Sequence, residues 1–291
     1  MDPHKIVYND IYNSTKLGFH ISPSELDCLV RNEDAEFPNI SVGDSKILTY
    51  LLSCSTTLHG GLYLMQDGSC QATSGSVVIN DFEIMTFPVT NYLFYLITHT
   101  CPSFHKGSTR PVENLNWLDC IIFANLYSQY FGMRPAYQYD PDARMQLGED
   151  ETAKIFADSV RLIDKNSWRL ATEAEWEYAT CCPKGLDDTH LHEGWDRSNS
   201  DWRTHAVGQK PPNPNGLYDM HGNTWDWTWN WFSPYDQIGG DGFGPLTGIK
   251  KTGRGGCWYH TPAECHPKVR RTGTPNSYCN SHGARLVRSL K

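Results

Sequence analysis

The feature that most constrains the fold is a set of patterned blocks that bracket an unpatterned stretch near the C-terminus. The first block, at residues 215–227, reads Asn-Gly-Leu-Tyr-Asp-Met-His-Gly-Asn-Thr-Trp-Asp-Trp. The tail begins with Arg-Gly-Gly-Cys-Trp at residues 254–258 and closes with Gly-Ala-Arg-Leu-Val-Arg at residues 283–288. Residues 259–282 between them show no apolar periodicity and are rich in Tyr, His, Ser, Thr, Asn, Pro, Gly and Cys. This arrangement predicts a rigid frame that displays a loop.

Chain length and charge narrow the class of protein. At 291 residues the chain is long enough for one large domain or two small ones with a full hydrophobic core. Its formal net charge of -8 argues against a nucleic-acid partner, which requires a basic face, and ordinary solubility explains the acidity equally well. The sequence contains no run of roughly eighteen apolar residues, so we expect no transmembrane segment.

Cysteine usage indicates buried thiols more than metal ligands. The 10 cysteines are irregularly spaced, and without a Cys-x-x-Cys pair there is no sign of structural zinc. The adjacent residues Cys181 and Cys182 are badly placed for a disulfide bond with each other. We expect buried thiols that act as small hydrophobic side chains at four positions: Cys28, Cys54, Cys101 and Cys120.

Three helices are marked by their N-terminal residues. Thr90 is the expected N-cap of the first helix, which covers an apolar stretch. Asn116 caps the second, whose apolar residues recur at helical spacing until Gly132 ends it. Thr172 and Glu175 have the three-residue spacing of a capping box and predict the start of the third helix.

Short strands and long loops account for most of the remaining chain. Strands are predicted at residues 62–65, 77–84, 136–139, 256–259 and 284–287. Residues 183–214 form a long loop, a length that is typical of function or of disorder. Few helices, many short strands and long loops indicate an α+β domain with much irregular structure.

Four tryptophans alternate with polar residues between Trp225 and Trp231, so one face of a strand carries all of them. We expect Trp225 and Trp227 in the core beneath the loop. We expect Trp229 and Trp231 to reach the surface and border a binding site.

Taken in order, these motifs resemble the formylglycine-generating-enzyme-like (sulfatase-modifying factor) branch of the C-type lectin fold. The matching pieces lie at residues 82–84, 88–91, 110–117, 168–179, 215–227, 254–258 and 283–288. The resemblance implies a C-type-lectin-like domain over residues 59–291, with a variable ligand-binding region at about residues 254–288. Residues 1–58 lie outside the match and are predicted to be an N-terminal elaboration packed on the main domain.

Within that branch, the ending Ala-Arg-Leu-Val-Arg-Ser is most similar to the variable proteins of diversity-generating retroelements. In that family, adenine-directed mutagenesis rewrites the stretch after the Arg-Gly-Gly motif to create new ligand-binding surfaces. Asparagine codons mutated in this way yield Tyr, His, Ser, Thr, Pro, Gly, Cys, Asp and Arg, among others. Only Glu264 and Lys268 in residues 259–282 fall outside the reachable set, although ordinary loops have a similar composition.

The resemblance places the ligand-binding surface on the loop. Tyrosine supplies large contact area at low entropic cost, while Ser, Gly and Asn supply adaptable hydrogen bonds. The plain alternative is a solvated connection without a partner. The predicted contact residues are Tyr259, His260, Cys265, His266, Arg271, Gly273, Thr274, Ser277, Tyr278, Cys279, Ser281 and His282.

The fold family also includes oxidoreductases, which gives the alternative function. The copper-dependent relatives place two cysteines five residues apart after the Arg-Gly-Gly motif, because two thiolates select Cu(I). In this chain His260 occupies the first of those positions and Cys265 the second, so the two-thiolate site is incomplete. The iron-dependent relatives need a histidine-rich helical motif, and the nearest cluster, at residues 190–193, lies in a predicted loop.

The resemblance further implies a structural calcium ion in the block at residues 219–226. The ligands would be the side chains of Asp219 and Asp226 and the carbonyl groups of Gly222 and Thr224, an oxygen set that suits Ca²⁺. Asp226 occupies a position where a glutamate is more usual, and its shorter side chain places the carboxylate farther from the expected ion. The alternative is that Asp219 caps a turn and Asp226 pairs with an arginine.

These inferences predict a non-enzymatic, receptor-like protein that displays a hypervariable surface and requires no cofactor. We expect a monomer whose partner is a macromolecule, a protein, with no nucleic acid involved. The resemblance implies a bacterial cell-surface location for the mature part of an exported or lipid-anchored protein, with a cytoplasmic location left open. A purely structural domain of a larger surface assembly is a further alternative.

Overall fold

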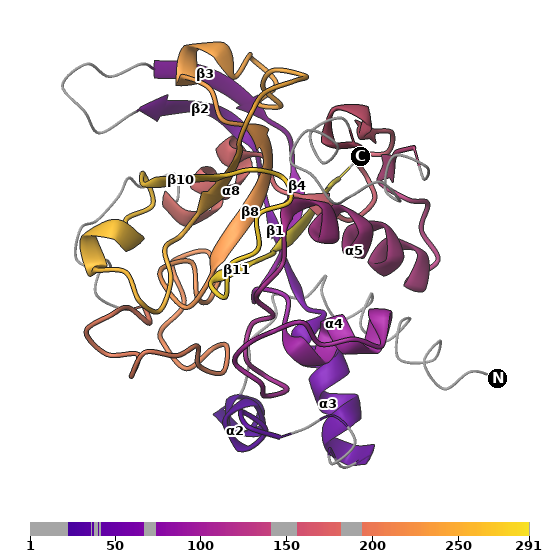
Figure 1. Ribbon diagram of the computed structural model, residues 1–291, viewed down its shortest axis with the longest axis vertical. Helices are drawn as coiled ribbons and strands as arrows, with labels where there is room; N and C mark the ends of the chain where they lie inside the picture. The colour runs from indigo at the N-terminus through magenta and orange to yellow at the C-terminus, as the bar shows by residue number, and fades with distance from the viewer. Residues whose placement is uncertain are drawn as a thin grey trace.

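A computed structural model describes residues 23–35, 37, 40, 42–66, 74–140, 156–181 and 194–290. These residues form a mixed α+β domain, as the sequence pattern predicts (Figure 1). The α-helices are α2 (Pro23–Arg31), α3 (Val42–Leu52), α4 (Asn91–Thr98), α5 (Trp117–Tyr130) and α8 (Glu173–Cys181). The 3-10 helices η4 (Tyr235–Gln237) and η5 (Pro262–Cys265) belong to the C-terminal part of the chain.

Two four-stranded sheets support the domain. The first has the order β1-β4-β12-β7, with bounds Ser55–Leu58, Phe82–Met85, Leu286–Ser289 and Arg169–Leu170. The second has the order β10-β9-β8-β11, with bounds Arg270–Gly273, Lys251–Arg254, Trp225–Trp231 and His282–Gly283. Strand β11 runs parallel to β8, whereas β9 is antiparallel to both β8 and β10. The tryptophan-rich strand β8 therefore lies beside both the start and the end of the loop.

Two small hairpins complete the strands of the described residues. The first pairs β2 (Gly61–Gln66) with β3 (Ser74–Ile79), and the second pairs β5 (Tyr137–Gln138) with β6 (Arg161–Leu162). They match the strands predicted at residues 62–65 and 136–139.

The three capped helices are confirmed. The Thr90 side chain accepts a hydrogen bond from the backbone N–H of Leu93 at 3.3 Å at the start of α4. Asn116 forms a capping box at the start of α5. At α8, the backbone N–H of Glu175 donates to Thr172 Oγ1 at 3.1 Å, and that of Thr172 donates to Glu175 Oε2 at 2.8 Å. These side chains satisfy N–H groups that a helix leaves without internal partners.

Three strand predictions were wrong in their bounds. Residues 77–84 divide into β3 and β4, because the side chain of Asp81 accepts the Gly60 N–H at 2.9 Å and holds a turn there. Residues 256–259 are not a strand, since Gly255 and Gly256 have φ angles of 101° and 81° that end β9 at Arg254. Strand β12 begins two residues later than predicted and joins the first sheet, not the sheet of β9.

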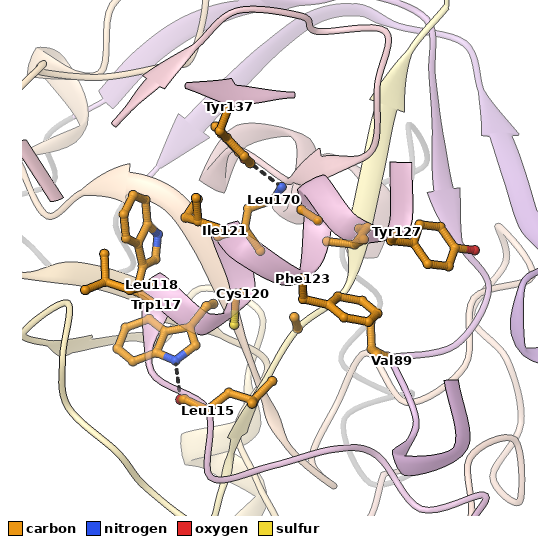
Figure 2. Close-up of a cluster of buried hydrophobic side chains, with 14 of the residues drawn as sticks. Val89, Leu115, Trp117, Leu118, Cys120, Ile121, Phe123, Tyr127, Tyr137 and Leu170 are labelled. Atoms are coloured by element: carbon orange, nitrogen blue, oxygen red, sulfur yellow. Dashed lines mark hydrogen bonds between the residues drawn. The ribbon is translucent and has the colours of Figure 1, made fainter. Parts of the chain in front are cut away.

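The main hydrophobic cluster lies between α5 and the two sheets (Figure 2). Trp117, Ile121 and Phe123 point into it from α5. Its polar atoms are paired: the backbone N–H of Leu170 donates to the Tyr137 hydroxyl at 2.9 Å, as Figure 2 shows. Buried polar groups need such partners, because a buried group left without its hydrogen bond reduces the stability of the fold by about 1–3 kcal/mol. This core gives the loop a firm support.

The described part of the N-terminal segment is attached by its own cluster and by ion pairs. Buried residues of α2 and α3 pack against Phe87, Tyr92 and Val207. The buried Arg110 side chain bonds to Asp34 at 2.7 Å and to Glu33 at 3.0 Å. The division of the chain at residue 58 stays a prediction, and residues 1–22 lie outside the described part.

The described cysteines follow the expectation of buried thiols in most cases. Cys28, Cys54 and Cys120 are buried, whereas Cys101 is half-buried. Cys182 lies outside the described residues. Among the described helices, none is long and apolar enough to cross a membrane.

Candidate ligand-binding surface

Residues 259–282, termed the display segment, leave the second sheet after β9 and return to it at β11. A side chain added at Gly256 would lie 2.4 Å from the sulfur of Cys265, so glycine is required where η5 approaches the turn. After η5, strand β10 pairs with β9, and an irregular stretch then leads to β11. The display segment is therefore mainly irregular chain fixed at both ends by strands.

The rest of the protein holds the display segment mainly by its backbone carbonyl groups, together with an ion pair between Arg270 and Glu173. The donors and their acceptor carbonyls are Arg197 N with His260, Arg254 Nη2 with Pro267, Trp117 N with Pro275, Asn114 N with Cys279, Trp258 Nε1 with Asn280, and Trp225 N with Ser281, at 2.7–3.1 Å. Because every residue type has a carbonyl group, these hydrogen bonds do not depend on the side chains of the display segment.

The predicted contact residues divide by exposure. Arg271 and Tyr278 are exposed, and 62% of the Tyr278 surface is accessible. The half-buried residues are Tyr259, His266, Gly273, Thr274, Ser277 and Cys279. The buried residues are His260, Cys265, Ser281 and His282. Direct contact with a macromolecule is therefore open to the first two groups, while the last group forms the floor beneath them.

The two buried histidines pack on the tryptophans of β8. The His282 ring stacks with Trp225 at 6.2 Å and contacts Trp227 at 4.8 Å between ring centroids. Burial, with the charges of Arg271 and His260, lowers the pKa of His282 to about 3. Burial is also the main cause that lowers the pKa of His260. Both imidazoles are therefore neutral at physiological pH.

Side chains of the largely half-buried turn that follows β10 bond mainly to near neighbours in sequence. Thr274 Oγ1 lies 2.6 Å from Ser277 Oγ and donates to Asn276 Oδ1 at 2.8 Å. Cys279 Sγ lies 3.1 Å from Ser281 Oγ. Such local contacts can be exchanged for others without disturbing the frame.

Two thiols and one imidazole meet at the base of the display segment. Cys257 Sγ lies 2.9 Å from His260 Nδ1, which is also 3.2 Å from Trp225 Nε1. Cys265 Sγ donates to the Cys257 carbonyl group at 3.8 Å. Burial raises the pKa of both thiols to about 12, which holds them protonated at neutral pH, whereas nucleophilic and metal-binding cysteines act as thiolates.

Three of the four carboxylate oxygens in the predicted calcium block have protein partners, and Asp226 Oδ1 is buried without one. Asp226 Oδ2 accepts from Trp176 Nε1 at 3.0 Å and from Arg285 Nε at 3.1 Å. Asp219 accepts from the backbone N–H of Gly208 at 2.8 Å and from the Asn223 amide at 3.1 Å. Burial raises the pKa of both carboxyl groups.

The cation in this block is an arginine side chain. Arg285 Nη2 also donates to the backbone carbonyl groups of Tyr218 and Asp219, at 2.7 and 3.3 Å. A calcium ion on the Asp219 and Asp226 oxygens would lie beside this fixed positive charge, which disfavours the ion, and the calcium site stays a prediction. In the described residues, no three His, Cys, Asp or Glu side chains are grouped to hold a metal.

The placement of the last two tryptophans of β8 differs from the prediction. Trp231 is buried and Trp229 is half-buried, and both pack on the main hydrophobic cluster. With Trp117 they surround the ammonium group of Lys251, which lies 3.8 Å from the Trp117 and Trp231 ring centroids. The aromatic faces offset part of the cost of burying this charge.

Sequence reasoning missed two exposed aromatic residues beside the display segment, Phe104 and Trp202. They are 70% and 60% exposed and belong to loops that precede it in the sequence. For Trp202 a signal existed, because it lies in the long aperiodic loop at residues 183–214. Nothing in the residues around Phe104 marked it.

Comparison with known proteins identifies the family. The family model named "Sulfatase-modifying factor enzyme 1-like domain" matches residues 52–290. "Chaperone protein LppX" of Paenibacillus barcinonensis is 29% identical over 210 residues, which cover 62% of this chain and 75% of that protein. "Formylglycine-generating enzyme" of Mycobacterium tuberculosis is 28% identical over 53% of this chain and 62% of its own length. "Serine/threonine-protein kinase pkn1" of Chlamydia caviae is 33% identical over 43% of this chain, but only 22% of the kinase is covered.

Solved structures agree with the family model. "Treponema denticola variable protein 1" superposes with a TM-score of 0.72 and 27% identity, covering 81% of this chain and 95% of that one. The sequence ending predicts a resemblance to the spirochete (Treponema) variable protein within the branch, and this structural match confirms it. "Structure of PvdO from Pseudomonas aeruginosa" superposes with a TM-score of 0.59 at 19% identity, covering 81% and 94%, and supports the fold alone. The C-type-lectin-like fold of this branch is thereby confirmed.

Proposed function

The chain belongs to the sulfatase-modifying factor enzyme 1-like domain family, and we propose that it is a non-enzymatic member that binds a protein ligand. In this proposal, a diversity-generating retroelement rewrites side chains within residues 254–288, so the surface is hypervariable. The similarity to Treponema denticola variable protein 1 supports the proposal. The protein acts as a monomer at the bacterial cell surface, which ultracentrifugation and protease treatment of intact cells would test.

The observation that carries the proposal is the way in which the display segment is held. Its backbone is fixed through carbonyl groups, while Arg271 and Tyr278 are exposed and the turn from Thr274 to Ser277 bonds within itself. Replacing exposed side chains there leaves the supporting hydrogen bonds intact. Such a surface suits binding that changes from one variant to the next, because loops on a rigid scaffold carry function without carrying stability.

A library experiment tests this function directly. Positions Arg271, Thr274, Ser277 and Tyr278 are randomised in the full chain, which is then displayed on yeast and panned against hen lysozyme. We expect most members to fold and specific lysozyme binders to emerge.

A matched library supplies the control. It randomises the same number of buried frame positions, Trp225, Asp226, Arg254 and Arg285, and we expect few folded members because their side chains pack and pair inside the domain. If display-segment members lose the fold as often as frame members, or yield no binder, the proposed function is wrong.

The alternative function is a copper- or iron-dependent oxidoreductase. The observation in its favour is that several relatives carry the name formylglycine-generating enzyme. Oxygen consumption by the copper-treated protein with a cysteine-containing peptide tests it. Turnover that disappears in Cys265→Ser, while the exposed Leu62→Ala control stays active, would establish the enzyme and overturn the binding role.

A further inference from the structure

Aromatic side chains from three separate segments pack in a row around the buried Trp258, and this row is termed the aromatic ridge. The Trp258 ring centroid lies 4.9 Å from that of Tyr259, 5.0 Å from His105 and 6.5 Å from Trp202. Phe104 extends the row, 5.0 Å from His105. This aromatic ridge therefore joins Phe104 and Trp202, which lie outside residues 254–288, to the start of the display segment.

Trp202 belongs to a strained turn that places its side chain at the surface. Asp201 and Trp202 have φ angles of 51° and 59°, a region that non-glycine residues rarely adopt and that costs on the order of 1–3 kcal/mol per residue. The turn is fixed from below, because Ser200 Oγ donates to the Trp258 carbonyl group at 2.6 Å. Strain of this kind persists where the surroundings enforce it, so the turn has one fixed conformation with the Trp202 ring at the surface.

Phe104 is positioned by buried polar contacts on both sides. The backbone N–H of Glu113 donates to Ser103 Oγ at 2.9 Å, and the backbone N–H of His105 donates to Glu113 Oε1 at 2.6 Å. Ser103 and Glu113 are buried, so the loop between them is fixed while 70% of Phe104 remains exposed. Two large aromatic side chains are thus held in solvent by parts of the molecule that the display segment does not include.

The charges beside the ridge favour an acidic partner. Arg197 lies over the Trp202 ring at 5.6 Å, and both Arg197 and Arg271 are exposed. Lys106 and Arg203, which follow His105 and Trp202 in the sequence, are exposed as well, so these cations outnumber the exposed acids nearby, Asp201 and Glu264. These cations beside an aromatic surface contrast with the net charge of -8 for the whole chain.

We propose that the aromatic ridge is a constant docking element for protein partners whose contact surface carries carboxylate groups beside apolar side chains. This inference rests on the proposed binding function. The display segment would select among partners, while Phe104 and Trp202 would contribute the same anchoring contacts to each complex. Aromatic residues dominate the binding energy of protein interfaces, and charge complementarity adds specificity and speed of association.

The test begins with a random peptide library on phage, panned against the full chain. Enriched peptides are synthesised, and their Kd is measured by calorimetry for the natural chain and for Phe104→Ser and Trp202→Leu. We expect Asp or Glu next to Phe, Tyr, Trp or Leu in the enriched peptides. We expect each variant to weaken binding about tenfold or more, and higher salt to weaken it further.

Controls separate this inference from the function on which it rests. Melting curves establish that each variant is folded, and Leu62→Ala supplies an exposed apolar change on β2, a strand that does not belong to the ridge. If peptide binding is lost on replacing Arg271, Ser277 and Tyr278 together but is unchanged in both ridge variants, the ridge inference is wrong and the binding function stands. Enrichment of basic peptides would also overturn it. If neither set of changes affects binding, both ideas are wrong.

Discussion

The frame around β8 and the display segment are fixed by different kinds of hydrogen bond. In the frame, charged side chains pair inside the protein: Arg254 contacts Glu173 and Glu177, and all three are buried. In the display segment, most long-range hydrogen bonds use backbone carbonyl groups, with the ion pair from Arg270 to Glu173 as the main side-chain contact, and the half-buried turn from Thr274 to Ser277 bonds within itself. The type of each side chain therefore matters for stability in the frame, and it matters much less on the exposed part of the display segment.

This difference also explains why a domain with such long irregular stretches can hold a fixed shape. A buried ion pair contributes little net stability, but removing one partner leaves an isolated charge that is costly. The frame is thus intolerant of change at each paired position. A carbonyl acceptor stays in place under any substitution except one that changes the backbone path.

The largest effect is expected for Trp225→Ala. The side chain is 1% exposed and packs against His260 and His282, so we expect a loss of about 3–5 kcal/mol in the free energy of unfolding. Trp258→Ala should fall in the same range, since that ring is 9% exposed. Urea unfolding measures both, with the exposed Tyr278→Ala as the control. If Trp225→Ala and Tyr278→Ala reduced the free energy of unfolding equally, the proposed difference in stability between the frame and the display segment would be wrong.

Arg254→Met should cost about 3 kcal/mol, because it leaves Glu173 and Glu177 buried without their guanidinium partner. The loss stays at the low end of the usual range, since Arg270 still contacts Glu173 at 2.5 Å. Arg271→Met, on the neighbouring strand β10, is the matched control and should change stability by less than about 0.5 kcal/mol. If Arg254→Met left the free energy of unfolding unchanged, the role assigned to the buried ion pairs would be wrong.

Acid should weaken the frame through His282. Its pKa is about 3 in the folded protein against 6.5 for an unperturbed histidine, so the unfolded chain binds the proton more readily. The contribution of neutral His282 is complete above about pH 6.5 and is lost as the pH falls towards 3. The natural chain should lose up to about 1.4 kcal/mol per pH unit relative to His282→Gln. Parallel pH profiles for the two chains, measured by urea unfolding, would refute this.

Replacing exposed display residues should have little effect on stability. We expect each of Arg271→Ser, Ser277→Thr and Tyr278→Ser to change the free energy of unfolding by about 0.5 kcal/mol or less, because Arg271 and Tyr278 are exposed and threonine keeps the hydroxyl group of the half-buried Ser277. The triple variant should melt with the natural chain. A large loss of melting temperature in that variant would show that the display segment supports the fold.

The smallest effect is expected for calcium. Because Arg285 supplies the cation beside Asp226, EDTA and added CaCl₂ should leave the melting temperature unchanged. A rise in melting temperature with calcium that Asp219→Asn abolishes would instead support the ion predicted from the sequence.

Sequence reasoning worked best where a local side-chain contact determines the structure. The helix starts at Thr90, Asn116 and Thr172 were found because an N-cap needs only residues close in sequence. The end of β9 was missed, although Gly255 and Gly256 were visible, because glycine is compatible with a strand as well as with a positive φ angle. Whether a glycine ends a strand depends on what it packs against.

Exposure within the display segment could not be predicted, for a related reason. His260, Ser281 and His282 are residue types that usually lie at the surface. In this protein the two histidines are buried because they pack against Trp225 and Trp227. An irregular segment has no period from which to assign an inward face. The partners that bury it come from distant parts of the chain, so only the assembled fold reveals them.

The hydrogen bonds to backbone carbonyl groups of the display segment also affect the free energy of ligand binding. A free loop must lose backbone entropy when it binds, which reduces affinity. The backbone at His260, Pro275 and Ser281 is already ordered in the unbound protein. Binding then restricts only the side chains, at about 0.5–1.5 kcal/mol for each long one that becomes immobile. A newly rewritten surface would thus begin with the preorganisation that antibodies acquire through affinity maturation.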